Sequence, residues 1–344
     1  MSMDLARPNN VDYMGGKYAL LAKRLEQFAY SNNFGFVNLT STLLDKQTIC
    51  SIKNDVIIAC VLWELVLSLD DINELNQTLF QSGKKLYLFT DCIVDEHYSV
   101  FDCVTVFSIP ECMGICADTK DYSQEKTSDK KRLYNCFMRR VDSVRQSWLY
   151  KLHNHNLLDQ GYVSFLLLQL ASYGNTGNLF EYNHFNYGMD KVENLHIAFL
   201  SLKDKVPFKN FDSDNTLEHA TLNSKYSLAL ETYAVDDDRH AWLFTEKTLR
   251  SLQIPNLDLI FCQKNGYKLL SNLGFECTDY ASADHLPWQQ RQDALLDVIL
   301  DDKIHYDDKL ERAKAAHNQE ILLNWKTKVL SDNFFDSYIE KIRV

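Results

Sequence analysis

The chain has 344 residues and a formal net charge of −11, from 36 Lys or Arg and 47 Asp or Glu residues. Its length predicts two domains, each large enough to bury a hydrophobic core of its own. The contents of hydrophobic residues (46%) and charged residues (24%) exclude disordered, collagen-like and coiled-coil chains. The negative net charge argues against a protein that coats nucleic acid through its overall charge, but it is compatible with a local basic surface.

Three features of the sequence bear on where the protein works. Residues 1–13 are polar and lack the apolar segment of a secretory signal. The most apolar stretch, residues 56–69, is interrupted by Glu64 and is shorter than the roughly 20 residues that cross a bilayer. The nine cysteines are an odd number in a long chain, which favours reduced thiols. We therefore expect no membrane span and a cytoplasmic protein, of a host or of a virus-infected cell.

Residues 1–125 are expected to form a first α/β domain. Apolar residues at helical spacing predict a helix over residues 16–30. Short apolar runs, typical of buried parallel strands, follow at residues 34–40, 56–63, 86–90 and 104–108. Between residues 116 and 131 the chain becomes polar and charged, which favours a linker between domains there.

Residues 126–310 are expected to form a second α/β domain. Its predicted strands are residues 133–138, 162–168, 195–200, 226–231 and 257–262, and its predicted helices are residues 143–157, 245–252 and 264–273. Charged helices over residues 311–344 are expected to pack back across the domains. The predicted fold class is therefore α/β, with two facing Rossmann-like domains and mainly parallel sheets. Ligands bind such sheets beyond the carboxyl ends of the strands, so the expected site is a cleft between the domains.

The most informative segment for function is residues 225–262. A predicted strand ends in Glu231, and a second segment reads Phe-Thr-Glu-Lys at the start of a predicted helix. Thr245 is suited to cap that helix, with Glu246 and Lys247 in its first turn, where the helix dipole favours anions. A carboxylate beside a lysine at such a place is suited to bind a ribose hydroxyl pair and a diphosphate. By spacing alone, an ordinary solvated helix start is the more common interpretation of the segment.

This segment resembles the core motif of the α1,3-fucosyltransferase family. The family has a strand ending in Phe-Glu-Asn before a Tyr-x-Thr-Glu-Lys helix start, and it adopts the GT-B fold of two Rossmann-like domains. The resemblance implies that Glu246 binds the nucleotide ribose, that Lys247 binds the diphosphate and that Glu231 lies near the sugar. Leu243 replaces the family's tyrosine and Thr232 its asparagine, so the nucleotide base and the sugar stay open.

A basic segment opens the second predicted domain. Eight Lys or Arg residues lie between Lys126 and Lys151. Arg139, Arg140 and Arg145 follow a predicted strand and enter an amphipathic helix, and the family has an arginine at a similar place. An arginine fork matches phosphate oxygens, so these three are candidates to neutralise the leaving diphosphate without a metal ion. A solvated basic helix face is an equally good interpretation, and the choice among the three stays open.

An inverting transferase also needs a base for the proton of the acceptor hydroxyl. Glu64 and Asp91 follow predicted strands of the first domain, where sites of this fold class gather. Asp95 and Asp12 are weaker candidates. For each of them, ordinary solvation or helix capping is the competing interpretation.

The leading interpretation is a metal-independent, inverting glycosyltransferase that moves a sugar from a nucleoside diphosphate to an acceptor hydroxyl. The second domain would bind the nucleotide-sugar donor, and the first would bind the acceptor. The acceptor is either a glycan or protein, or a hydroxymethylated base of phage DNA that is flipped out of the stack. We expect no cofactor besides the donor substrate, and we assign no residue as a metal ligand.

Two other classes of function stay open. Residues 236–238 are all Asp, and Asp212 and Asp214 form a pair, as in metal-dependent GT-A transferases or phosphoesterases. Exposed polar loops have the same composition. A noncatalytic nucleotide-binding module is the remaining alternative, since it would keep the donor site without an acceptor base.

Overall fold

The computed structural model describes residues 15–38, 46–62, 68–116, 120–125, 130–138, 143–165, 220–231, 234, 240–278 and 281–343. Its strands form two four-stranded sheets and one two-stranded sheet. The chain divides into two compact units. Unit 1 consists of Met1–Ala117, Asp237–Glu246 and Ile321–Val344, and unit 2 consists of Asp118–Asp236 and Lys247–Glu320.

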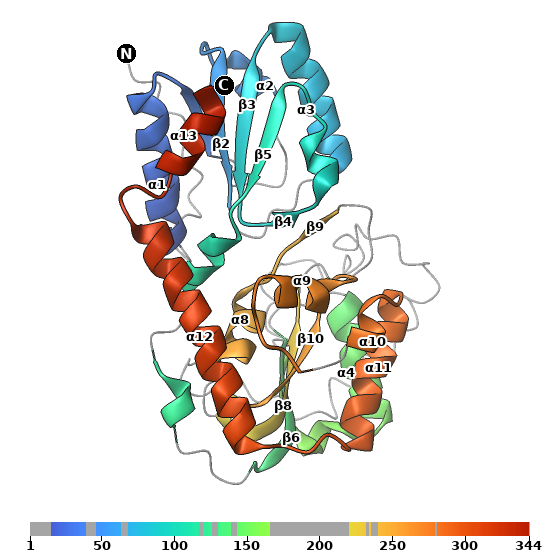
Figure 1. Cartoon of the computed structure of the whole chain (residues 1–344). Coiled ribbons are helices and arrows are strands. Elements are labelled where there is room, and N and C mark those ends of the chain that lie inside the picture. Colours follow the sequence, from blue (N-terminus) through green and yellow to red (C-terminus); the bar gives the residue numbers. More distant parts are fainter. Residues whose placement is uncertain are drawn as a thin grey trace. The chain divides into compact units, whose positions relative to one another are not determined.

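The main sheet of unit 1 is entirely parallel, in the order β1-β2-β3-β5. Its strands are β1 (Gly35–Asn38), β2 (Val56–Val61), β3 (Lys85–Thr90) and β5 (Val104–Ser108). Its helices are α1 (Gly15–Ser31), α2 (Lys46–Ser51), α3 (Leu69–Ser82) and α13 (Asp336–Arg343), with 3₁₀ turns η1 (Glu96–Ser99) and η2 (Pro110–Cys116). Helices α1 and α13 lie on one face of this sheet and α3 lies on the other (Figure 1).

Both faces of this sheet are buried, as its apolar strands predict. Residues 57–61 of β2 have no exposed surface. Helix α3 presents Ile72, Leu75 and Leu79 at helical spacing to one face. A capping box between Ser68 and Asp71 begins α3, and Gly83, in the left-handed conformation that glycine adopts without strain, ends it.

The C-terminal segment completes the core on the other face. Phe334 and Phe335 are buried with Ile58, Phe89 and other residues of the sheet. The hydroxyl of Tyr87 on β3 donates to the carbonyl of Ile342 over 3.2 Å. Unit 1 is therefore built from both ends of the chain.

The sheet of unit 2 is also parallel throughout, in the order β10-β8-β6-β7. Its strands are β6 (Arg132–Met138), β7 (Gly161–Phe165), β8 (Ser224–Leu230) and β10 (Leu257–Phe261). Its helices are α4 (Ser143–Asn154), α8 (Glu246–Gln253), α9 (Gly266–Asn272), α10 (Ala281–Asp284) and α11 (Trp288–Asp301), with the first half of α12 (Asp308–Leu330). Two short 3₁₀ turns, η3 (Tyr122–Gln124) and η4 (Leu158–Gln160), lie in the same unit.

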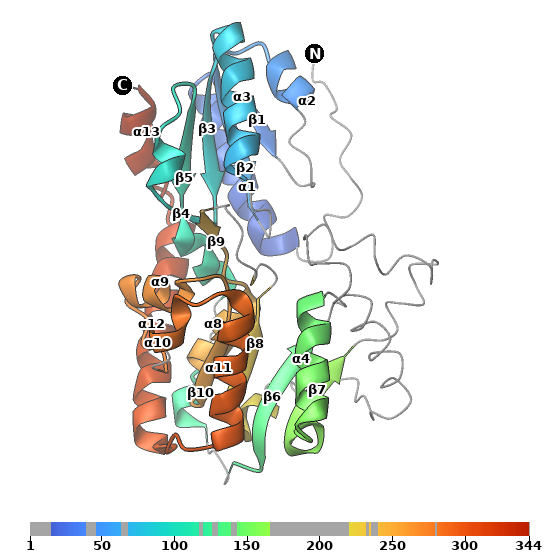
Figure 2. The same ribbon diagram turned by 90° about the vertical axis from the view of Figure 1, so that its right-hand side faces the viewer.

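Helices cover both faces of this second sheet. Figure 2 shows α4, α11 and the strands of unit 2 from the side. Helices α4 and α11 are neighbours, joined by a 3.0 Å hydrogen bond from Ser147 to Gln292, and Trp148 of α4 packs edge-on against Phe261 of β10. Helices α8 and α12 are joined by a bond of 3.1 Å from the Asn318 amide to the carbonyl of Leu252. The sheet is thus a buried middle layer, the usual environment of parallel strands.

The predicted α/β class with mainly parallel sheets is confirmed. The predicted strand at residues 195–200 lies outside the described residues. The division into units departs from the predicted boundaries at residues 125 and 310, because Asp237–Glu246 and Ile321–Val344 return to unit 1. Among the described residues, no helix combines the length and the apolarity that crossing a bilayer requires.

Gly114 gives a test of how closely η2 packs against α12 in unit 1. A Cβ atom at this position would lie 2.6 Å from the backbone nitrogen of Lys326 and 2.8 Å from the carbonyl oxygen of Leu322, both in α12. Because these are backbone atoms, the helix itself would have to move. We expect Gly114→Ala to lower the free energy of unfolding by about 2 kcal/mol, measured by urea denaturation.

The matched control is Gly83→Ala, whose Cβ would meet no atom within 4 Å and costs only the strain of a left-handed residue, about 1 kcal/mol. Stability equal to that of the unchanged protein in Gly114→Ala would contradict the packing of η2 on α12.

Candidate functional site

The strand order of unit 2 reverses between β6 and β8. From β6 the chain continues to β7 on one side, whereas from β8 it continues to β10 on the other. Because every pairing is parallel, the carboxyl ends of these strands lie at one edge. We call the residues that follow β6, β8 and β10 at this edge the switch edge. Open α/β sheets bind ligands at such a reversal, beyond the carboxyl ends of the strands.

Glu231 is the first residue after β8 and lies within the switch edge. It is 2% exposed, and its backbone N–H donates to the carbonyl of Phe261, at the end of β10, over 2.9 Å. Its carboxylate accepts a 2.5 Å hydrogen bond from the hydroxyl of Thr248 in the first turn of α8. A buried carboxylate strengthens such a bond, so Glu231 fixes the start of α8 against the strand end.

The Thr-Glu-Lys segment stands at the start of α8, in agreement with the predicted helix start. Helix α8 begins at Glu246, so Thr245 occupies the preceding position and is buried. Glu246 and Lys247 are half-buried. The division between the units passes between these two residues. Lys247 belongs to unit 2 with Glu231 and Thr248, and in the first turn of α8 its charge adds to the positive end of the helix dipole.

Arg291 of α11 was not predicted as a site residue, yet it organises the switch edge. The residue is 5% exposed, and its guanidinium donates to the carbonyl of Ala234, beyond β8, over 2.9 Å and to that of Cys262, after β10, over 3.0 Å. A third bond of 2.5 Å reaches the carbonyl of Leu286. The guanidinium thereby supplies donors to two buried carbonyls, and two strand ends are tied to one helix.

A small cavity lies beside this arginine. It has a volume of about 10 Å³, which is room for about one water molecule, and is lined by Arg291, Asp284, Tyr267 and apolar residues. Burial raises the pKa of Asp284, and hydrogen bonds from the N–H groups of Lys268 and Tyr267 oppose this only in part. The cavity is too small for a nucleotide, so it belongs to the support of the switch edge.

Of the three predicted arginines, only Arg145 is described. Arg139 and Arg140 directly follow β6 in the sequence and lie outside the described residues. Arg145 is 2% exposed. Burial raises the pKa of the Cys136 thiol to about 12, and the charge of Arg145 opposes this, which indicates that the guanidinium lies near β6. In this structure Arg145 therefore has almost no surface with which to contact a diphosphate.

Two described basic residues of the window between Lys126 and Lys151 lie away from the switch edge. Lys130 and Arg132 lie at the amino end of β6, the opposite end from the switch edge. The ammonium of Lys130 donates to the carbonyls of Leu222 and Pro255, over 2.9 and 2.8 Å. Burial lowers the pKa of Lys130 to about 8. Lys130 and Arg132, the described basic residues before and at the start of β6, are therefore not part of the proposed diphosphate site.

The predicted acceptor bases differ in whether the structure describes them and in how exposed they are. Glu64 and Asp12 lie outside the described residues. Asp91 directly follows β3, as predicted, but is 2% exposed. Burial is the main cause that raises the pKa of the thiols of Cys60 and Cys112, and the negative charge of Asp91 is the second cause for both. The carboxylate of Asp91 therefore lies close to both thiols. As it stands, Asp91 has almost no surface for an acceptor.

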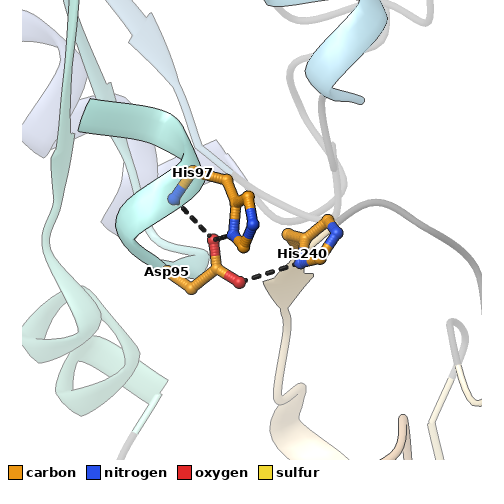
Figure 3. Close-up of side chains that lie close together, drawn as sticks. All are labelled: Asp95, His97 and His240. Carbon is orange, nitrogen blue, oxygen red and sulfur yellow. Dashed lines mark hydrogen bonds and ion pairs between the residues drawn. The ribbon is translucent and has the colours of Figure 1, made fainter. Parts of the chain in front are cut away.

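Asp95, the weaker candidate, lies in a cluster with two histidines of unit 1 (Figure 3). Its Oδ1 is 2.9 Å from Nδ1 of His97, and its Oδ2 is 2.9 Å from Nδ1 of His240. The two imidazole rings lie 4.2 Å apart between centroids. Side-chain exposure is 27% for Asp95, 53% for His97 and 37% for His240, so solvent reaches all three.

Backbone pairing brings this cluster together. The short strands β4 (Ile93–Val94) and β9 (Ala241–Trp242) pair antiparallel, and the N–H of Asp95 donates to the carbonyl of His240 over 3.2 Å. Burial raises the pKa of Asp95, but hydrogen bonds from the backbone and ring of His97 and from His240 outweigh it, so the net shift is downward. Asp95 is therefore an ionised carboxylate near neutral pH.

The two histidines were missed because they are far from each other in the sequence. Asp95 and His240 are 145 residues apart, and the strands that join them have two residues each. Strands this short have no periodicity to detect. The available signal was the Asp-x-His spacing of Asp95 and His97. The acidic residues 236–238, Asp212 and Asp214 lie outside the described residues.

Arg291 gives a direct test of the switch edge. We expect Arg291→Ala to lower the free energy of unfolding by about 3 kcal/mol or more, because two buried carbonyls and one part-buried carbonyl lose a charged donor. Arg291→Lys should recover only part of this loss, since an ammonium cannot reproduce the guanidinium fork. Urea denaturation measures both. Equal stability of Arg291→Ala and the unchanged protein would show that these bonds do not hold the strand ends.

Comparison of the chain with protein-family models, with curated proteins and with solved structures gives no match. The functional assignment therefore depends on the geometry of the two units and on the motif at residues 225–262.

Proposed function

We propose that the protein is a glycosyltransferase that binds a nucleoside-diphosphate sugar at the switch edge of unit 2. The observation that carries the proposal is the hydrogen bond from Thr248 to the buried Glu231, which fixes the first turn of α8, and with it Lys247, beside the end of β8. That turn lies at the reversal of strand order where α/β sheets bind nucleotides. The resemblance of the motif to the fucosyltransferase family supports the same assignment, and two units with parallel sheets are compatible with a GT-B fold.

The proposed donor site has three parts. Lys247 donates to the diphosphate from the positive end of α8. Arg139 and Arg140 follow β6, the strand that pairs with β8, and are proposed to neutralise the same diphosphate. Glu246 accepts from the ribose hydroxyls. Glu231 holds Thr248, and its role beside the sugar depends on the same placement of α8.

The proposed reaction is a single displacement at the anomeric carbon. The acceptor oxygen attacks that carbon, the bond to the diphosphate oxygen breaks, and its electron pair leaves with the diphosphate. Lys247 and the arginines stabilise the negative charge that develops there, without a metal ion. A carboxylate of the first unit takes the proton of the acceptor hydroxyl, and Glu64 is the candidate, since Asp91 is only 2% exposed. The configuration at the anomeric carbon is inverted.

Lys247→Ala tests this proposal. The variant should release nucleoside diphosphate from nucleotide sugars at least about 100-fold more slowly than the unchanged protein, because the developing charge loses its nearest cation. The assay measures diphosphate release from a panel of UDP, GDP and ADP sugars in the presence of a chelator.

The matched control is Lys309→Ala. Lys309 is likewise the second residue of a helix of unit 2, α12, and is exposed. It should leave the rate unchanged. Full activity of a folded Lys247→Ala, or activity in the unchanged protein that the chelator abolishes, would contradict the proposal. Nucleotide binding without any turnover would instead indicate a noncatalytic module.

A further inference from the structure

The cluster of Asp95, His97 and His240 in unit 1 has no part in the proposed donor site. Among the described residues, these three each offer one ligand atom, and the three atoms lie within 4.8 Å of one another. Two imidazoles and one carboxylate form a ligand set that suits divalent ions of the first transition series, such as Zn²⁺ and Fe²⁺. This chemistry differs from that of the proposed donor site, where the described groups are the ammonium of Lys247 and the carboxylates of Glu231 and Glu246.

The separations within the cluster match those of a coordination sphere. Each histidine Nδ1 lies 2.9 Å from a carboxylate oxygen of Asp95. Two neighbouring ligands around an ion with bonds of about 2.1 Å are about 3 Å apart in octahedral geometry and about 3.4 Å apart in tetrahedral geometry. Since all three ligand atoms lie within 4.8 Å of one another, rotations about the side-chain bonds are enough to turn them toward one ion.

The backbone holds these ligands in place before any ion binds. Asp95 and His240 continue the pairing of β4 with β9 through the bond from the N–H of Asp95 to the carbonyl of His240. The N–H of His97 donates to Oδ1 of Asp95 over 2.9 Å, and this bond orients the carboxylate. Hydrogen bonds of this kind from outside the coordination sphere fix ligand orientation in metal sites.

We propose that Asp95, His97 and His240 bind one divalent transition-metal ion, with one ligand from each residue and water in the remaining positions. The ion replaces the two hydrogen bonds between the imidazole rings and the carboxylate. Each imidazole binds the ion in its neutral form, with its single ring proton on the nitrogen that faces away from the ion. The exposure of all three side chains gives the ion access and leaves coordination positions open to solvent. The proposal does not depend on glycosyl transfer.

The test is a titration of the full chain, freed of metal by a chelator, with Co²⁺ followed by its visible absorption and with Zn²⁺ as competitor. We expect one Co²⁺ per chain, and an absorption spectrum without the sulfur-to-cobalt charge-transfer band that a cysteine ligand would add. His97→Ala and His240→Asn should each weaken binding at least about tenfold. Asn is chosen for position 240 because His240 has a φ of 55°, which Asn tolerates.

The matched controls are His155→Ala and His305→Ala, two exposed histidines elsewhere in the chain, which should leave the affinity unchanged. Thermal unfolding without metal checks that every variant is folded. Undiminished Co²⁺ binding by a double variant of His97 and His240, or no binding by the unchanged protein, would overturn the proposal. The cluster would then be a hydrogen-bonded network between β4 and β9 only. Because no nucleotide is used, either outcome is separate from the test of Lys247.

Discussion

The parallel pairing of β8 with both β6 and β10 is the constraint on which the candidate site depends. It brings the ends of three strands, separate in the sequence, to one edge. Glu231 leaves β8 at this edge and is buried, so its carboxylate requires a donor, and Thr248 supplies one from α8. Arg291 satisfies carbonyls beyond β8 and after β10. The position of Lys247 thus follows from sheet pairing and two buried charged groups.

Unit 1 depends on a different constraint, since it is assembled from three separate stretches of chain. The C-terminal aromatic residues fill the face of its sheet that α1 covers, and Gly114 lets η2 approach α12 closely. The third stretch contributes His240 beside Asp95. The cluster of Asp95, His97 and His240, the proposed metal site, therefore forms only when unit 1 is folded. The short antiparallel pair of β4 and β9 sets its position.

Much of the fold could be predicted because its strands are compact apolar runs and its helices carry apolar residues at helical spacing. Strands β3, β5, β6 and β10 and helices α1 and α8 lie within two residues of their predicted bounds. Burial was harder to predict. Asp91 next to a strand end and Arg145 in the first turn of α4 are charged residues of a kind usually found at the surface, yet both are 2% exposed. The role of Arg291 could not be predicted, since its partners are backbone carbonyls that no residue type reveals. His240 became a candidate only through a pairing over 145 residues.

The central claim is that the switch edge binds a nucleoside diphosphate without a metal ion. The most direct measurement is thermal unfolding of the full chain with a panel of nucleoside diphosphates and nucleotide sugars, with and without magnesium. A ligand that binds the folded state alone stabilises it by about 2.7 kcal/mol at 100 times its Kd. We predict a selective rise in Tm with nucleotides of one base, equal with and without magnesium. No rise with any nucleotide, or a rise only with magnesium, would contradict the account.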